Sequence, residues 1–417
     1  MKTRFKYAFV AFLTIFIFAS CNKKDKDVKG EELPTPDASA DIAGEAMMDG
    51  GSSTGGGDNG QQQSLAGQVT AAEWQDILHW DFWSKLMLGN HQDSTQTDYS
   101  KFSDYWRLYT NNLLYVEVNN NLNEPIEGVQ VELRRKGSQS PAWQAVTDIY
   151  GHAYLWYGFL QATALDDASG FELLLNGEVQ DQTLVFTHWG DADVAVNLFT
   201  YDAGQPETTL DLAFIVDATG SMGDEINFLK DDLLDILNQV KAKQGSTAIR
   251  TGALFYRDEG DEYLTRHSNF TTDFSQTISF IKNQNADGGG DFPEAVHTAL
   301  ERGLQDLSWS ETTSVKLAFL LLDAPPHYND QVIQSLQKSI PLYAEKGIHI
   351  IPVAASGVDK ETEFFLRFTA LATDGTYLFL TNDSGIGGDH LQATVGEYEV
   401  MPLNDLMVKV INRYLGE

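Results

Sequence analysis

The C-terminal half of the chain alternates between apolar runs of strand length and amphipathic runs of helix length, and this alternation restricts its fold more than any other feature. Apolar strands that lack polar alternation are buried on both faces, which requires a mostly parallel sheet covered by helices. We therefore predict an α/β fold over residues 206–417, with a doubly wound, mostly parallel sheet. The predicted strands are Asp211–Val216, Ile249–Tyr256, Val315–Leu322, His349–Val353 and Tyr377–Leu380. The predicted helices are Gly223–Lys243, Phe274–Asn283, Pro293–Leu304, Asp330–Lys346, Lys360–Leu371 and Asn404–Tyr414.

The first residues carry the pattern of a bacterial export signal. A basic start is followed by an apolar run, residues 8–18, that is too short to span a bilayer comfortably. Cys21 is the only cysteine of the chain, and the Phe-Ala-Ser-Cys run that it ends resembles the lipobox of bacterial lipoproteins. The resemblance implies a signal peptide over residues 1–20, cleavage before Cys21 and lipid attachment to its sulfur. An ordinary secretory signal with a chance cysteine is the alternative. We expect an outer-membrane lipoprotein of the bacterial cell envelope, exposed on the surface or facing the periplasm.

Three segments separate this signal from the α/β region. Residues 21–64 are rich in glycine, serine, glutamine and charge and lack apolar periodicity, which predicts a disordered tether. Residues 65–112 are dense in aromatic side chains, and a capping box that begins at Thr70 predicts a helix there. We expect a small helical segment packed on its neighbour, with a carbohydrate platform as the alternative. Residues 113–205 alternate with a period of two between turn signals, which predicts a β-sandwich.

The β-rich region also carries two short patterns, Pro-Ile-x-Gly-Val-x-Val from Pro125 and Thr-Asp-x-x-Gly-x-Ala from Thr147. They resemble the transthyretin-like, Ig-type repeats of carboxypeptidase regulatory domains and bacterial adhesin stalks. This resemblance implies a domain that spaces or presents its neighbours.

The charge of the whole chain, −32 from 60 acids and 28 bases, argues against nucleic acid as a partner, because phosphate binding requires a basic face.

Polar side chains follow the apolar strands at three points. Asp217, Thr219 and Ser221 come directly after the first strand, where ligands of open α/β sheets bind. Asp291 lies in a glycine-rich loop before a helix, and Asp323 follows the central strand. Carboxylate and hydroxyl oxygens suit a hard cation such as Mg²⁺ or Ca²⁺. Each of the three aspartates has an alternative interpretation as a helix cap or a turn residue.

The Asp-x-Thr-x-Ser loop in this context resembles the metal-ion-dependent adhesion site of von Willebrand factor type A domains, and the resemblance covers about half of the chain. The family places a third hydroxyl on a second glycine-rich loop, where this chain has Asp291, and an aspartate after the central strand, which Asp323 matches. The resemblance implies a cation that captures a carboxylate of a partner protein. The additional carboxylate of Asp291 should favour metal retention and weaken the attraction for an acidic ligand. The implied metal ligands are Asp217, Thr219, Ser221, Asp291 and Asp323.

These features lead to three hypotheses for function. The first is a lipid-anchored envelope protein that binds a protein ligand through the cation and meets the membrane only through its lipid. The second is an assembly scaffold with a structural metal. The third is a metal-dependent hydrolase with His327 or Asp258 as base. The chain has no His-Glu-x-x-His or P-loop motif and no Gly-x-Ser-x-Gly nucleophile elbow with ordered triad partners, so we do not expect an enzyme. We expect Arg257 and Asp258 in a surface turn and His327 on the rim of the site.

Overall fold

The computed structural model describes the part of the chain that follows the predicted tether. The described residues are 67–89, 98–162, 165, 167–202, 204, 208–223, 225–244, 247–311, 314–384 and 390–417. The predicted signal peptide, Cys21 and residues 21–64 lie outside them. Among the described residues, no helix has the length and apolar character needed to cross a membrane.

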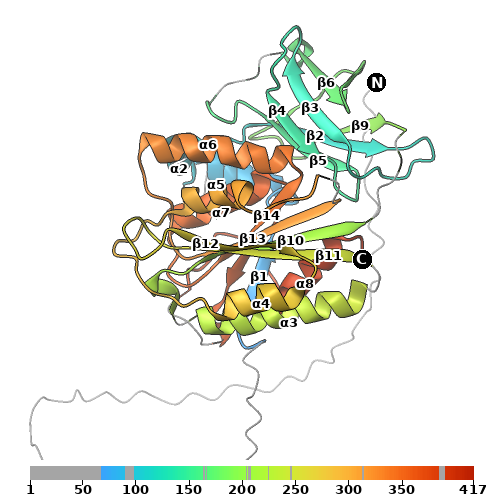
Figure 1. The fold of residues 1–417 in the computed structure, drawn as a ribbon. Helices are drawn as coiled ribbons and strands as arrows, with labels where there is room; N and C mark the ends of the chain where they lie inside the picture. The colour runs from blue at the N-terminus through green and yellow to red at the C-terminus, as the bar shows by residue number, and fades with distance from the viewer. Residues whose placement is uncertain are drawn as a thin grey trace, which may run out of the picture. The chain divides into compact units, whose positions relative to one another are not determined.

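The main feature is an eight-stranded mixed sheet, in the order β12-β11-β10-β13-β14-β15-β1-β16 (Figure 1). The five strands from β11 to β15 in this order run parallel to one another, and the other three pair antiparallel. Their bounds are β1 Thr70–Trp74, β10 Thr209–Asp217, β11 Ala248–Tyr256, β12 Thr265–Thr271, β13 Val315–Leu322, β14 Ile348–Ala354, β15 Tyr377–Leu380 and β16 Met401–Pro402. All five predicted strands are present, and the mixed α/β class is confirmed.

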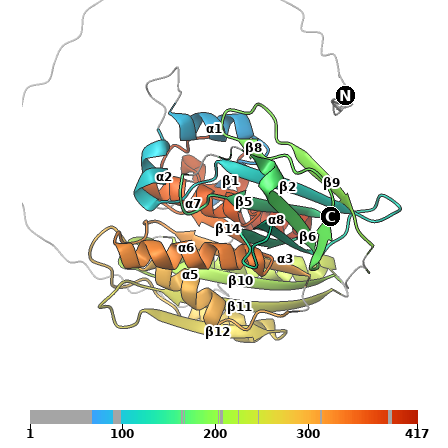
Figure 2. The ribbon, with the colours of Figure 1, turned by 90° about the horizontal axis from the view of Figure 1, so that it is seen from above.

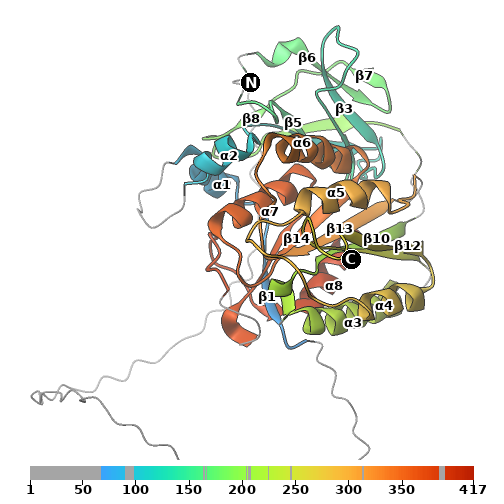
Figure 3. The ribbon, with the colours of Figure 1, turned by 60° about the vertical axis from the view of Figure 1, so that its left-hand side comes forward.

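Helices cover both faces of this sheet (Figures 1 and 3). One face carries α3 (Ile226–Gln244), α4 (Phe274–Lys282) and α8 (Leu403–Tyr414), and the other carries α5 (Val296–Gln305), α6 (Asp330–Glu345) and α7 (Lys360–Ala372). Successive residues of β10 pack into different cores: Phe214 belongs to the cluster under α3 and α8, and Ile215 to the cluster under α5 and α6. Burial on both faces explains why these strands are apolar along their whole length.

Residues 112–200 form two smaller, mostly antiparallel sheets, ordered β5-β2-β8 with β9 beside β2, and β4-β3-β6-β7 (Figures 1 and 3). Buried residues of the two sheets, among them Val116 and Leu173, share one hydrophobic cluster, as expected of two packed sheets. The strands are β2 Asn112–Asn119, β3 Gln130–Arg135, β4 Trp143–Val146, β5 His152–Tyr157, β6 Phe171–Leu175, β7 Glu178–Gln180, β8 Thr187–His188 and β9 Val196–Thr200.

The aromatic-rich segment differs from its prediction. Thr70–Trp74 is not the start of a helix but strand β1, which lies between β15 and β16. Pairing with two strands buries Ala71 and Ala72 completely, so tertiary contacts override the local capping signal at Thr70. Only afterwards does the chain form α1 (Trp80–Leu88) and α2 (Ser100–Trp106), which lie beside α7 (Figures 2 and 3).

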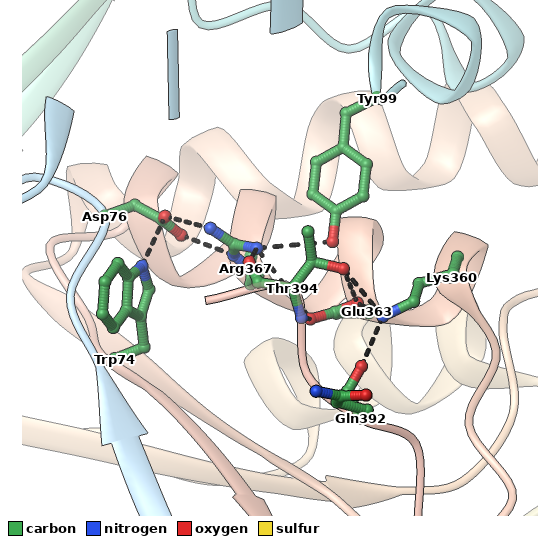
Figure 4. Close-up of polar contacts among 8 residues, drawn as sticks. All are labelled: Trp74, Asp76, Tyr99, Lys360, Glu363, Arg367, Gln392 and Thr394. Carbon is green, nitrogen blue, oxygen red and sulfur yellow. Dashed lines mark hydrogen bonds and ion pairs between the residues drawn. The ribbon is translucent and has the colours of Figure 1, made fainter. Parts of the chain in front are cut away.

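A buried ion pair joins this segment to α7 (Figure 4). The Arg367 guanidinium is fully buried, and its Nε donates to Asp76 Oδ2 at 3.0 Å. Its Nη1 donates to the Thr394 carbonyl at 2.6 Å. The rings of Trp83 and Tyr99 flank the guanidinium carbon, each at 5.4 Å. The positive charge of Arg367 in α7 is therefore paired with Asp76, which precedes the β-sandwich in the chain.

Candidate metal centre

The first polar loop is ordered by its own hydrogen bonds. Asp217 Oδ1 accepts from the Thr219 backbone N at 2.8 Å and from Thr219 Oγ1 at 2.7 Å. Thr219 Oγ1 lies 3.2 Å from Ser221 Oγ, so the three side chains gather at the end of β10. Asp323 follows β13, the parallel neighbour of β10, and Ser221 is close enough to its carboxyl to affect its pKa. The structure thus brings Asp217, Thr219, Ser221 and Asp323 together at the carboxyl ends of β10 and β13.

The glycine-rich loop lies directly against the first loop. Gly220 N donates to the Gly288 carbonyl at 3.0 Å, and Asp287 N donates to the Ala218 carbonyl at 3.0 Å. Gly288 and Gly289 both have positive φ, at 80° and 72°. A Cβ on Gly289 would lie 3.2 Å from Thr219 Cβ and 3.0 Å from Glu294 Oε1. Glycine is therefore required for the close approach and for the backbone conformation.

The glycine-rich loop supplies Glu294 to the cluster, not Asp291. Asp291 is exposed, and among the described residues no hydrogen bond or ion pair of its carboxylate is found. Glu294, three residues later, is buried, and Asp217 and Asp323 are both close enough to perturb its ionisation. Asp291 therefore faces solvent, and Glu294 lies in the interior of the loop cluster. Sequence spacing alone did not identify Glu294.

Three carboxylate oxygens in this cluster are buried and have no hydrogen-bond partner: Asp217 Oδ2, Asp323 Oδ1 and Glu294 Oε2. Burial, followed by repulsion from Asp323, raises the pKa of Asp217, and burial also raises the pKa of Asp323. Burial and repulsion from the other carboxylates, led by Asp217, raise the pKa of Glu294 to about 9. Buried negative charge without a partner is costly, and a hard divalent cation is the species that such oxygens suit.

Carboxylates alone do not complete the centre. Within the described residues, no three His, Cys, Asp or Glu side chains are grouped so that they could hold a metal ion by themselves. The hydroxyl oxygens of Thr219 and Ser221, which meet at 3.2 Å beside Asp217, are the further oxygen donors of this cluster. A mixed carboxylate and hydroxyl donor set fits Mg²⁺ or Ca²⁺.

Two residues expected on the surface are instead buried supports of the centre. The Arg257 guanidinium donates to the Ala218 carbonyl at 3.2 Å and to the Asn285 carbonyl at 2.9 Å, which ties the first loop to the glycine-rich loop. Asp258 Oδ1 lies 2.6 Å from His327 Nε2, which ties the end of β11 to the loop after β13. In the sequence, these two residues are marked only by the Tyr-Arg-Asp run at the end of a buried strand. Such a polar run usually indicates a surface turn.

The raised pKa of Glu294 predicts how the metal-free protein responds to pH. A carboxyl whose folded pKa of about 9 exceeds its ordinary value of 4.5 contributes stability that is present below pH 4.5 and is lost as pH rises through 9. In EDTA, we expect the unfolding free energy to fall by about 2–3 kcal/mol between mildly acidic and mildly alkaline pH. Melting curves of the wild type and Glu294→Gln measure this, because the amide should remove the part of the slope that Glu294 contributes and leave the part that comes from Asp217 and Asp323, whose pKa values are also raised. A wild type that is equally stable across this range would contradict the expectation.

Comparison with known proteins assigns part of the chain to a domain family. Residues 211–363 match the family model of the von Willebrand factor A domain. The chain is 33% identical over 134 residues to a putative ariadne-like RING finger protein of Acanthamoeba polyphaga mimivirus, covering 32% of this chain and 13% of that protein. It is 28% identical over 187 residues to the collagen alpha-6(VI) chain of Homo sapiens, covering 43% and 8%. It is 31% identical over 130 residues to the alpha-protein kinase vwkA of Dictyostelium discoideum, covering 31% and 20%.

The chain spans a fifth or less of the length of each of these relatives. The matched residues run from β10 into α7 and include the three loops that form the cluster. The match and the observed strand order agree with the resemblance seen in the Asp-x-Thr-x-Ser loop. Residues 211–363 of this chain are a von Willebrand factor A domain.

Proposed function

We propose that the von Willebrand factor A domain binds Mg²⁺ or Ca²⁺ and that the loaded site binds a protein partner. Domains of this family generally mediate protein binding or adhesion. The observation that supports the cation is the trio of unpartnered buried oxygens on Asp217, Asp323 and Glu294. Thr219 and Ser221 would supply neutral oxygens. A bound cation would act as an electrophile that accepts an oxygen of the partner as a further ligand.

We further propose that the protein works at the bacterial cell envelope, held to the outer membrane by a lipid on Cys21. This location is supported by the lipobox-like run that ends at Cys21 and by the export pattern before it. The chain enters the α/β body at β1, ahead of the β-sandwich, so the tether would lead directly to the body that contains the metal-binding domain. Metabolic labelling with a lipid precursor, in the wild type and in Cys21→Ser, tests the anchor.

The two carboxylates of the glycine-rich loop provide the sharpest test of the site. We expect Glu294→Ala to weaken Mg²⁺ binding by at least about tenfold, because it removes an inward-facing oxygen donor. Asp291→Ala, in the same loop, should change the affinity by less than about threefold, because that carboxylate is exposed. Isothermal titration calorimetry of both variants and the wild type measures this. A wild type that binds neither Mg²⁺ nor Ca²⁺ would refute the cation, and a larger loss in Asp291→Ala would restore the assignment made from sequence.

Partner binding needs a separate experiment. The immobilised chain is used to capture envelope proteins in Mg²⁺ and in EDTA, and Asp323→Ala is compared after its folding has been checked. This experiment distinguishes a partner-binding metal site from a structural one. The scaffold hypothesis requires that capture be unchanged by EDTA and by the variant. The hydrolase hypothesis has the His327–Asp258 pair in its favour. It requires hydrolysis of a test ester or phosphate that is lost in Asp217→Ala.

A further inference from the structure

The loops around the candidate metal centre carry an excess of exposed acidic side chains. Glu259, Glu262, Asp287 and Asp291 are exposed, and we call them the acidic rim. The Asp287 side chain is 81% exposed and that of Glu262 is 69% exposed. Apart from His327, the one basic residue of loops 257–264, 284–295 and 323–329 is Arg257. Its buried guanidinium also lies 3.9 Å from Glu262 Oε2 and 3.8 Å from Asp287 Oδ2, and it therefore offsets part of the rim charge. Arg266, in β12, pairs with Glu262 as well, at 3.0 Å. Glu259 and Asp291 are the rim acids for which no ion pair is found among the described residues.

A divalent cation in the centre would be balanced by the carboxylates of the centre and would not offset the charge of the rim. Asp217, Asp323 and Glu294 together carry three charges when ionised, and a divalent ion offsets two of them. Glu294 Oε2 is a buried oxygen without a hydrogen-bond partner, in a residue that is only 3% exposed, and it would contact the cation. An acidic surface of this kind attracts positively charged groups and repels carboxylates over a Debye length. Electrostatic complementarity therefore favours a basic partner.

Exposed aromatic rings accompany these acids. Phe292, between Asp291 and Glu294, is 46% exposed at the tip of the glycine-rich loop. Tyr328, just after His327, is 45% exposed, and its ring stacks at 3.7 Å on Tyr105. None of these rings is part of the hydrophobic core. An aromatic face beside carboxylates is a favourable environment for an ammonium or guanidinium group, which gains from cation–π contact.

We propose that the acidic rim and Phe292 bind a basic protein segment, whose lysine or arginine side chains contact the rim while one of its oxygens approaches the cation. This inference rests on the proposed function, because it assigns the chemistry of the partner of that same site. It differs from capture of an acidic ligand, which would have to overcome the charge of Glu259, Asp287 and their neighbours.

The test uses the full chain and two synthetic peptides as probes. One is a lysine-rich dodecapeptide, and the other has glutamate at each lysine position with the same glycine and serine spacers. Fluorescence anisotropy in Mg²⁺ at physiological ionic strength measures their binding. The double variant Glu259→Gln/Asp287→Asn removes two rim charges, and Phe292→Ala removes the ring. The matched control is Glu178→Gln/Asp181→Asn, which removes two exposed acids from the β-sandwich.

We expect the lysine peptide to bind the wild type, and the rim double variant to weaken this by about threefold to tenfold. Phe292→Ala should weaken it similarly, and the sandwich control by less than twofold. Equal weakening by the sandwich control would overturn the proposal, because attraction would then come from the overall charge. The proposal would also be overturned if the wild type preferred the glutamate peptide and lost this binding in Asp323→Ala, because the site would then bind an acidic ligand. Calorimetry with Mg²⁺ alone separates the hypotheses: no cation binding refutes the proposed function, whereas cation binding with no rim effect refutes only this inference.

Discussion

Asp76→Ala is expected to lower the unfolding free energy by about 3–5 kcal/mol, because it leaves a fully buried arginine without its partner. Arg367 has no access to water, and Asp76 accepts two of its hydrogen bonds. The Thr394 carbonyl and the Tyr99 hydroxyl are neutral and do not balance the charge. The buried Glu363 carboxylate lies farther away, at 3.9 Å from Nη1, and it already pairs with Lys360 at 2.8 Å. Chemical denaturation of the purified variant, compared with the wild type, measures the loss.

Asp81→Ala is the matched control. Asp81 forms an ion pair with Lys85 in the nearby helix α1, but both side chains are more than half exposed. An exposed pair of this kind contributes at most about 1 kcal/mol. If Asp76→Ala is no more damaging than Asp81→Ala, the buried ion pair does not stabilise the junction between the aromatic-rich segment and α7.

Asp217→Asn is expected to have opposite effects on metal binding and on stability. Loss of the carboxylate should weaken Mg²⁺ by more than the roughly 10- to 100-fold that loss of an outer-shell partner costs. In EDTA at mildly alkaline pH, the same variant should be more stable than the wild type by about 1–2 kcal/mol. Burial and repulsion by Asp323 raise the pKa of Asp217, so the ionised form is disfavoured in the folded protein. The amide can still accept the hydrogen bonds from Thr219.

Asp232→Asn separates these two effects. Asp232 lies in α3, where burial raises its pKa to about 7, and its Oδ2 also lacks a partner. This variant should gain stability in EDTA without any change in Mg²⁺ affinity. Calorimetry and melting curves of both variants provide the comparison. If Asp217→Asn destabilises the metal-free protein, Asp217 acts as a loop cap and the interpretation as a strained metal ligand fails.

The sequence was sufficient for the parts of the molecule that depend on local pattern. The apolar runs gave the strands of the large sheet, with Val315–Leu322 and Tyr377–Leu380 matching β13 and β15 at both ends. The alternation of Asp217, Thr219 and Ser221 is likewise local, because the hydrogen bonds that order the loop are made within five residues. Asp323 was found because it directly follows a central strand of a parallel sheet.

The features that the sequence did not predict are settled by contacts between distant segments. β1 pairs with β15, about 300 residues later, and its own capping pattern indicated a helix. The choice between Asp291 and Glu294 depends on the path of the glycine-rich loop, in which Gly288 and Gly289 have positive φ. The burial of Arg257 could not be predicted from its neighbours in the sequence, because it depends on hydrogen bonds to the carbonyls of Ala218 and Asn285.

The position of β1 has a mechanical consequence. The chain enters the large sheet at β1, leaves it to build the β-sandwich, and returns at β10. Both ends of the sandwich therefore join the same α/β body. Tension applied through the residues before Thr70 would load the hydrogen bonds of β1 with β15 and β16 in shear, and these bonds must break together. Such a force would act on the large sheet without first stretching the sandwich. Force applied through the tether and force applied through a partner bound at the candidate metal centre would therefore both act on the same sheet.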